Sequence, residues 1–217
     1  MEVRILSENL AGAVSQASRA VAKRSTLPQG DCVLLETVEG RLRVTGTDLE
    51  TAISVYAGCM VEGEGKALIP AGTLARALAS FPACAIDLTL DGNALALSSN
   101  GRAFSLDGLD PQDYPPTPDA PDRVADLDPI SLRRALGRIL DCAATDGLRP
   151  ILETVNFALH DGALTLAASD GFRLGVHKVE TDWQHPPVDP FPEINVPVKT
   201  LHKLYRLLPK PKDADEA

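Results

Sequence analysis

Apolar residues at helical spacing occur in SENLAGAVSQASRAV (7–21) and again in PISLRRALGRILDCA (129–143). In both stretches the spacing is i, i+4, i+7 and i+11, which lines one face of an α-helix. Each apolar residue of the second stretch lies 122 positions after its counterpart in the first. The pairs are Leu10 and Leu132, Val14 and Leu136, Ala17 and Ile139, and Val21 and Ala143. We therefore predict two equivalent helices in an internally repeated chain.

The repeat extends beyond these helices. The same offset carries Thr47-Asp48 onto Ser169-Asp170, and each pair ends a run of alternating apolar and polar residues. With five more residues inserted, IPAGTLARALASFP (69–82) aligns with VPVKTLHKLYRLLP (196–209). Because the matches occur in the same order, each repeat is predicted to contain a helix, several strands and a second helix.

Tight-turn signals separate the predicted strands. Glu39-Gly40, Asp91-Gly92 and Asp161-Gly162 each lie between alternating runs, as in antiparallel hairpins. The predicted fold class is therefore α+β, with repeated domains of two helices packed on antiparallel β-meanders. Residues 83–109 add at least two strands to the first repeat, whereas only KPKDADEA follows Pro209. We expect the second domain to lack its last strands and to leave a sheet edge uncovered.

Proline residues mark the boundary between the repeats. They are frequent from 110 to 129, where they interrupt both helices and sheets. We predict a first domain at 1–120, a linker at 121–128 and a partial second domain at 129–217. Asp128 is expected to cap the next helix, and Pro129 to occupy its first position.

Composition narrows the class of protein. The 217 residues are 44% hydrophobic, and the formal net charge is -9. No apolar run is long enough to span a membrane, and the N-terminus has no signal-peptide pattern, so we predict a cytoplasmic location. The four cysteines lie far apart without metal-ligand spacing. We expect reduced core thiols, with no metal and no cofactor.

Positive charge is concentrated on the predicted helices of the second repeat. Residues 198–212 contain five Lys or Arg and no acidic residue, although the chain as a whole is acidic. Ordinary solvation of a charged helix face is one explanation, but solvated faces usually mix both signs of charge. We favour sequence-independent contact with the DNA backbone. The candidate residues are Arg133, Arg134, Arg138, Lys199, Lys203 and Arg206.

Enzymatic motifs are missing from the sequence. There is no GxSxG, Walker A loop or HExxH, and the four histidines have no ligand spacing. Asp48 and Asp170 recur at equivalent positions after a strand, where an aspartate commonly accepts hydrogen bonds from turn amides. We predict that both aspartates have a structural role and that the protein has no catalytic site.

The ordered set of motifs resembles the bacterial sliding clamp, the beta subunit of the replicative DNA polymerase III holoenzyme. The resemblance covers the N-terminal domain and part of the middle domain. It includes the opening helix and the following stretches: KRSTLP (23–28), VTGTDLE (44–50), IPAGTLARAL (69–78), FSLDGLDPQDYP (104–115), LRPILETVNF (148–157), LAASDGFRLGV (166–176) and INVPVKTLHKLYRLLP (194–209).

The resemblance implies a DNA-clamp fold and a non-catalytic processivity factor that encircles double-stranded DNA. Its implied partners are DNA, the polymerase and clamp-loader subunits, and its implied assembly is a homo-oligomer. Lys23 and Arg24 match a loop that touches DNA in the family. A half-groove for a partner peptide is implied at Leu152, Ser169, Gly171, Phe172, Arg173 and Leu174. For Leu152 and Leu174, packing in the core is the alternative.

The sequence also departs from the family. We expect no third domain in this chain, and Phe172 stands where the family often has histidine. The chain would therefore be a truncated clamp subunit or a short variant that assembles differently. The alternative function is that of a clamp-derived regulatory protein that binds partners without encircling DNA.

Overall fold

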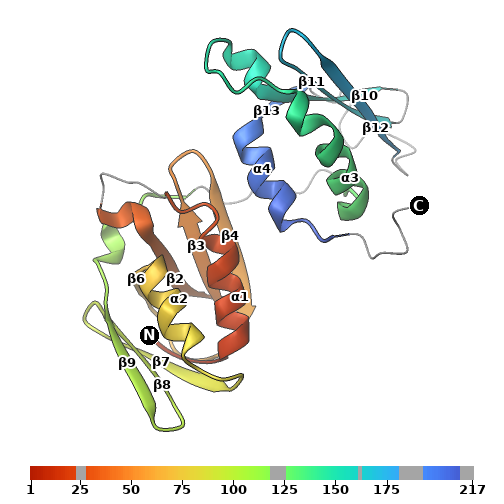
Figure 1. Ribbon diagram of the computed structural model, residues 1–217. Coiled ribbons are helices and arrows are strands. Elements are labelled where there is room, and N and C mark those ends of the chain that lie inside the picture. The colour runs from red at the N-terminus through yellow and green to blue at the C-terminus, as the bar shows by residue number, and fades with distance from the viewer. Residues whose placement is uncertain (23–27, 118–125, 161–162, 181–192, 211–217) are drawn as a thin grey trace. The chain divides into compact units, whose positions relative to one another are not determined.

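The computed structural model describes residues 1–22, 28–117, 126–160, 163–180 and 193–210 (Figure 1). The chain divides into two compact units, Met1–Asp119 (unit 1) and Ala120–Ala217 (unit 2). All the strand pairs of both units are antiparallel. Each unit packs two helices against its sheets, so the predicted α+β class of helices on antiparallel meanders is confirmed.

Unit 1 contains two sheets and two principal helices. The first sheet has the order β4-β3-β2-β6, and the second has the order β5-β1-β7-β8-β9. The elements are β1 (Glu2–Leu6), α1 (Ser7–Ala17), η1 (Pro28–Asp31), β2 (Cys32–Val38), β3 (Arg41–Thr47), β4 (Ala52–Gly58), β5 (Met60–Gly63), β6 (Lys66–Pro70), α2 (Ala71–Ala79), β7 (Ala85–Asp91), β8 (Ala94–Ser99), β9 (Arg102–Asp107) and η2 (Pro111–Asp113).

Unit 2 repeats the first sheet and the helix pair of unit 1. Its sheet has the order β12-β11-β10-β13, the same arrangement as β4-β3-β2-β6. The strand register repeats too, because Leu35 pairs with Val44 and Phe157 pairs with Leu166. The elements are α3 (Pro129–Ile139), η3 (Leu140–Cys142), η4 (Pro150–Glu153), β10 (Thr154–His160), β11 (Ala163–Ser169), β12 (Leu174–Glu180), β13 (Ile194–Pro197) and α4 (Val198–Leu207). Among the described residues, unit 2 has no counterpart of the second sheet.

The apolar helix faces predicted from sequence form the cores. In unit 1, Leu10, Val14 and Leu74 are buried against strands of both sheets. In unit 2, Leu132, Leu136 and Ile139 of α3 are buried with Leu201 of α4. Burial of such side chains contributes about 1.5 to 3 kcal/mol each, which makes these faces the main attachment of the helices.

Element ends differ in places from the sequence prediction. Helix α1 ends at Ala17 rather than continuing to Val21, and the Ser18 hydroxyl donates to the carbonyl of Val14 at 2.6 Å. Glu39 and Gly40 form a hairpin turn with positive φ at both residues, as predicted. The next turn falls one residue later than predicted, at Gly92-Asn93, because Asp91 pairs with Ala94. Asp161-Gly162 lies outside the described residues.

The start of α3 follows its predicted chemistry. The carboxylate of Asp128 accepts a hydrogen bond from the Ser131 amide at 2.7 Å, and Pro129 occupies the first turn. The hydrogen bond from Ser131 lowers the pKa of Asp128. The N-cap therefore fixes where α3 begins and which of its residues face the core.

Two further expectations concern the burial of the cysteines and the length of the helices. Cys32 is buried, but Cys59, Cys84 and Cys142 are only partly buried, so the expectation that all four are core thiols is too strong. Burial raises the pKa of the Cys32 thiol to about 12, which keeps it protonated at neutral pH. In the parts of the chain that the structure describes, the helices are too short or too polar to cross a bilayer.

Candidate nucleic-acid interface and peptide groove

The predicted cations of unit 2 lie on α3 and α4, outside the buried apolar faces of the two helices. Arg134, Arg138, Lys199 and Arg206 are exposed, and Lys203 is half-buried. We refer to these five residues as the basic face. On α4 the three cations follow the spacing i, i+4 and i+7, which places them on one side of the helix. Helix amphipathicity thus presents positive charge outward while Leu201 is buried beneath it.

Arg133 differs from the other predicted cations because its side chain reaches α4. Its guanidinium donates to the backbone carbonyls of Tyr205 and Leu208, the latter at 2.8 Å. The same guanidinium lies over the Tyr205 ring, 4.2 Å from its centroid. Sequence placed Arg133 with Arg134 on a polar face, but the structure places it between the two helices.

The helices of unit 1 carry much less positive charge. No Lys or Arg lies within α1, and α2 contains Arg76, which donates to the Thr73 hydroxyl at 3.3 Å. Arg19 is exposed just after α1. Lys23 and Arg24, the predicted DNA-contacting loop, lie outside the described residues.

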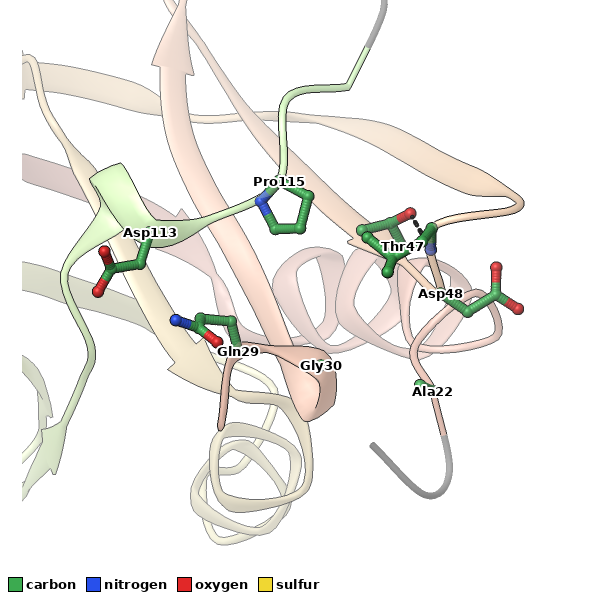
Figure 2. A pocket seen from close by; sticks show the side chains of 8 residues that line it. Ala22, Gln29, Gly30, Thr47, Asp48, Asp113 and Pro115 are labelled. Carbon is green, nitrogen blue, oxygen red and sulfur yellow. Dashed lines mark hydrogen bonds between the residues drawn. The ribbon is translucent and has the colours of Figure 1, made fainter. Parts of the chain in front are cut away.

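A pocket adjoins Ala22 on one side of that loop and Gln29 and Gly30 on the other (Figure 2). The amide of Ala22 donates to the carbonyl of Gly30 at 3.1 Å, which brings the two flanking segments together. Thr47 and Asp48 line the pocket from the end of β3, and Asp113 and Pro115 line it from the segment after β9. Three segments distant in sequence therefore meet at this pocket.

The half-groove residues of unit 2 are organised by a tight turn after β11. The carboxylate of Asp170 accepts hydrogen bonds from the amides of Phe172 and Arg173, both at 2.9 Å. These hydrogen bonds lower the pKa of Asp170, and the Arg173 guanidinium, 2.9 Å from the same carboxylate, lowers it further. The Ser169 hydroxyl donates to the carbonyl of Arg173 at 2.8 Å. The predicted structural role of Asp170 is confirmed.

The turn lies against Leu152. Gly171 has a φ of +91°, and a Cβ added there would lie 4.0 Å from Cδ1 of Leu152. Phe172 is fully exposed and Leu174 is 68% exposed, so neither packs in the core of unit 2. Leu152 itself is half-buried. The fold therefore brings the predicted groove residues to one end of the sheet and leaves apolar side chains accessible.

Sequence reasoning missed further apolar residues in this region. Leu148 and Ile151 precede β10, Val176 follows Leu174 on β12, and all three are exposed. Arg149 also lies nearby, because its Nη1 would be 3.6 Å from a Cβ added at Gly171. The sequence did hold a signal for Leu148 and Ile151. They are apolar residues in a proline-containing loop, where neither helical nor strand periodicity calls for an apolar residue.

The same turn recurs in unit 1. The Thr47 hydroxyl donates to the carbonyl of Thr51 at 3.1 Å and accepts from the Leu49 amide at 3.0 Å, as Ser169 does with Arg173 and Gly171. Asp48 accepts from the amide of Thr51 at 2.9 Å. The structural role predicted for Asp48 is confirmed, and the repeat extends to individual hydrogen bonds.

The described residues show no grouped metal ligands. They contain no group of three or more His, Cys, Asp or Glu placed to hold a metal ion. His177 lies on β12, where burial and the nearby Arg138 lower its pKa.

Comparison with known proteins gives consistent matches over both units. Residues 1–118 match the family model of the DNA polymerase III beta subunit, N-terminal domain, and residues 126–215 match the model of its central domain. The chain is 29% identical to a beta sliding clamp of Halalkalibacterium halodurans over 205 residues, which is 90% of this chain and 54% of that protein. It is 26% identical to a beta sliding clamp of Streptomyces coelicolor, covering 96% of this chain and 55% of that protein.

Solved structures of sliding clamps are also similar to this chain. The DNA polymerase III beta subunit of Pseudomonas aeruginosa superimposes with a TM-score of 0.87 at 26% identity, over 95% of this chain and 56% of that chain. The sliding clamp of Bacillus subtilis also gives a TM-score of 0.87, over 96% of this chain and 57% of that chain; its 21% identity supports the fold alone. The chain thus spans about half the length of the curated relatives it matches.

Proposed function

The chain belongs to the DNA polymerase III beta subunit family, and on that premise we propose that it is a sliding-clamp subunit or a truncated form of one. In this role it binds duplex DNA without reading sequence and tethers the replicative polymerase as a processivity factor. A tether raises the effective concentration of its partner at the DNA and needs no catalytic group of its own.

The observation that carries the proposal is the basic face of α3 and α4. In a chain with a net charge of -9, two adjacent helices carry five cations, of which four are exposed and Lys203 is half-buried. Lysine and arginine neutralise phosphates and release counterions, which gives binding that is independent of base sequence. The acidic remainder of the chain would repel DNA elsewhere and favour this one surface.

The turn at 169–174 supports a second part of the proposal, the capture of a partner peptide. Exposed Phe172 and Leu174 offer apolar contact, and the amide hydrogen bonds to Asp170, with its ion pair to Arg173, define the conformation of the turn. Rigid apolar anchors lose little entropy when a peptide docks. We propose that the polymerase and clamp-loader subunits use this surface and that the protein acts in the cytoplasm as part of a homo-oligomer.

A charge-reversal variant tests the DNA-binding proposal. Arg134→Glu with Arg138→Glu should weaken binding to a short fluorescent DNA duplex at low salt by about tenfold or more, because both residues would then repel phosphate. Lys178→Glu is the matched control. Lys178 is exposed on β12, where the neighbouring Gly175 and His177 turn the opposite side of the strand toward α3.

Fluorescence anisotropy measures the affinities, and circular dichroism checks that each variant is folded. Losses that are equal per reversed charge for the double variant and for the single reversal Lys178→Glu would contradict a specific basic face and indicate only a general response to charge. Wild-type affinity in the folded double variant would falsify the proposal.

A further inference from the structure

Arg133 makes contacts that tie the C-terminus of α4 to α3. One guanidinium nitrogen, Nη1, donates to the carbonyl oxygens of both Tyr205 and Leu208. The guanidinium carbon lies 4.2 Å from the centroid of the Tyr205 ring, within the range of a cation–π contact. Arg133 is half-buried in this position, whereas its neighbour Arg134 is exposed.

Tyr205 also contacts the next turn of α3. A Cβ added at Gly137 would lie 3.4 Å from Cε2 and Oη of the Tyr205 ring. Gly137 follows Arg133 by four residues, so both lie on the same side of α3. The ring is therefore held between an arginine and a glycine of one helix, and we call these three residues the clasp.

The clasp provides a hydrogen-bond donor and a positive charge at the C-terminal end of α4. The last carbonyls of an α-helix have no partner within the helix, and the C-terminal end of the helix dipole attracts positive charge. Leu208 has left the helical conformation, with ψ of 141°, while its amide still donates to Leu204. The guanidinium of Arg133 supplies both a donor and a positive charge where they are required.

In unit 1, the arginine that binds a carbonyl at the end of the second helix comes from a strand. The carbonyl of Ser80, at the end of α2, accepts a hydrogen bond from Arg102 of β9, a strand of the second sheet. At the position equivalent to Arg133, unit 1 has Ala11. The described part of unit 2 has no second sheet, and α3 itself supplies the arginine.

We propose that Arg133 is a positioning residue that fixes the end of α4, and with it the direction of Lys199, Lys203 and Arg206, rather than a residue that itself contacts phosphate. The consequence for DNA rests on the function proposed above. The clasp itself does not, because it concerns only the attachment of α4 to α3.

Hydrogen exchange of the full chain tests the clasp directly. Arg133→Met and Tyr205→Leu should each increase amide exchange over residues 198–208 by about fivefold, as expected from loss of a cation–π contact together with a helix-end hydrogen bond. Tyr205→Phe keeps the ring and should exchange as the wild type does. Arg134→Met removes an equal charge from the same helix and should also leave α4 unchanged. Wild-type exchange of α4 in both Arg133→Met and Tyr205→Leu would overturn the proposal.

DNA affinity then separates positioning from contact. Tyr205→Leu retains every cation, yet it should weaken duplex binding by about threefold to fivefold because the cations of α4 are no longer held in place. If Tyr205→Leu binds as tightly as wild type and Arg133→Met loses no more than Arg134→Met, Arg133 is a simple phosphate contact and the proposal is wrong. A wild-type protein that fails to bind DNA would refute the proposed function alone, and the exchange data would still decide on the clasp.

Discussion

Unit 1 and unit 2 share a four-stranded sheet, a helix pair and a hydrogen-bonded turn, but they secure their second helix differently. In unit 1, one face of α2 is buried from Ala71 to Leu78, and Phe81 beyond its end packs edge-to-face on Phe104 of the second sheet. In unit 2, the equivalent Leu208 is only half-buried, and Arg133 holds the helix end. The comparison indicates that the same arrangement of sheet and helices allows the second helix to be attached in two ways. In unit 1 it is attached through the second sheet, and in unit 2 through the first helix.

The number of positively charged residues on the helices also differs between the two units. The helices of unit 1 carry Arg76 as their one cation, whereas those of unit 2 carry the basic face together with Arg133. The proposed DNA contact accordingly lies mainly with the unit whose helices hold each other.

The largest expected difference between the units concerns the second sheet. Phe81→Ala should lower the free energy of unfolding of unit 1 by about 3 to 4 kcal/mol, because it leaves a cavity against Phe104. Leu208→Ala should cost unit 2 only about 1 kcal/mol, since that side chain keeps part of its contact with water. Urea unfolding, monitored by hydrogen exchange separately in each unit, measures both losses in the free energy of unfolding. Equal costs at the two positions would contradict the view that their ends are packed differently.

A smaller effect probes the turn that the units share. Hydrogen bonds from Phe172 and Arg173 lower the pKa of Asp170 below its ordinary 3.8. The stabilisation from this carboxylate is therefore complete above pH 3.8 and is lost as pH falls through the lower folded-state pKa. A carboxyl carbon titration by NMR should place the midpoint below 3.8, and Asp170→Asn should remove that signal. A midpoint at or above 3.8 would show that the turn does not hold the charged form.

Sequence predicted the features that depend on local pattern. Apolar spacing located α1 and α3, and the aligned stretches 69–82 and 196–209 located α2 and α4. The offset of 122 located the repeat, and Asp128 with Pro129 located the start of α3. These succeed because periodicity, capping and turn chemistry are properties of neighbouring residues.

Features that depend on tertiary contact could not be predicted in this way. A helical wheel groups Arg133 with Arg134, but Tyr205 lies 72 residues farther along the chain and only the fold brings it to Arg133. Helix α1 ends before Val21, and Ala20 just beyond it is fully buried. Leu148 and Ile151 escaped notice because exposed apolar residues in a loop follow no period.

The salt dependence of DNA binding by the unmodified chain tests the central claim most directly, namely that cations on α3 and α4 contact phosphates. Affinity for a duplex of arbitrary sequence should fall steeply as salt rises, with a log–log slope of about 0.9 for each phosphate contacted. Reversing Arg134 and Arg138 to glutamate should reduce that slope by about 2. A slope near zero for the wild type, or the same slope in the folded double variant, would contradict the account.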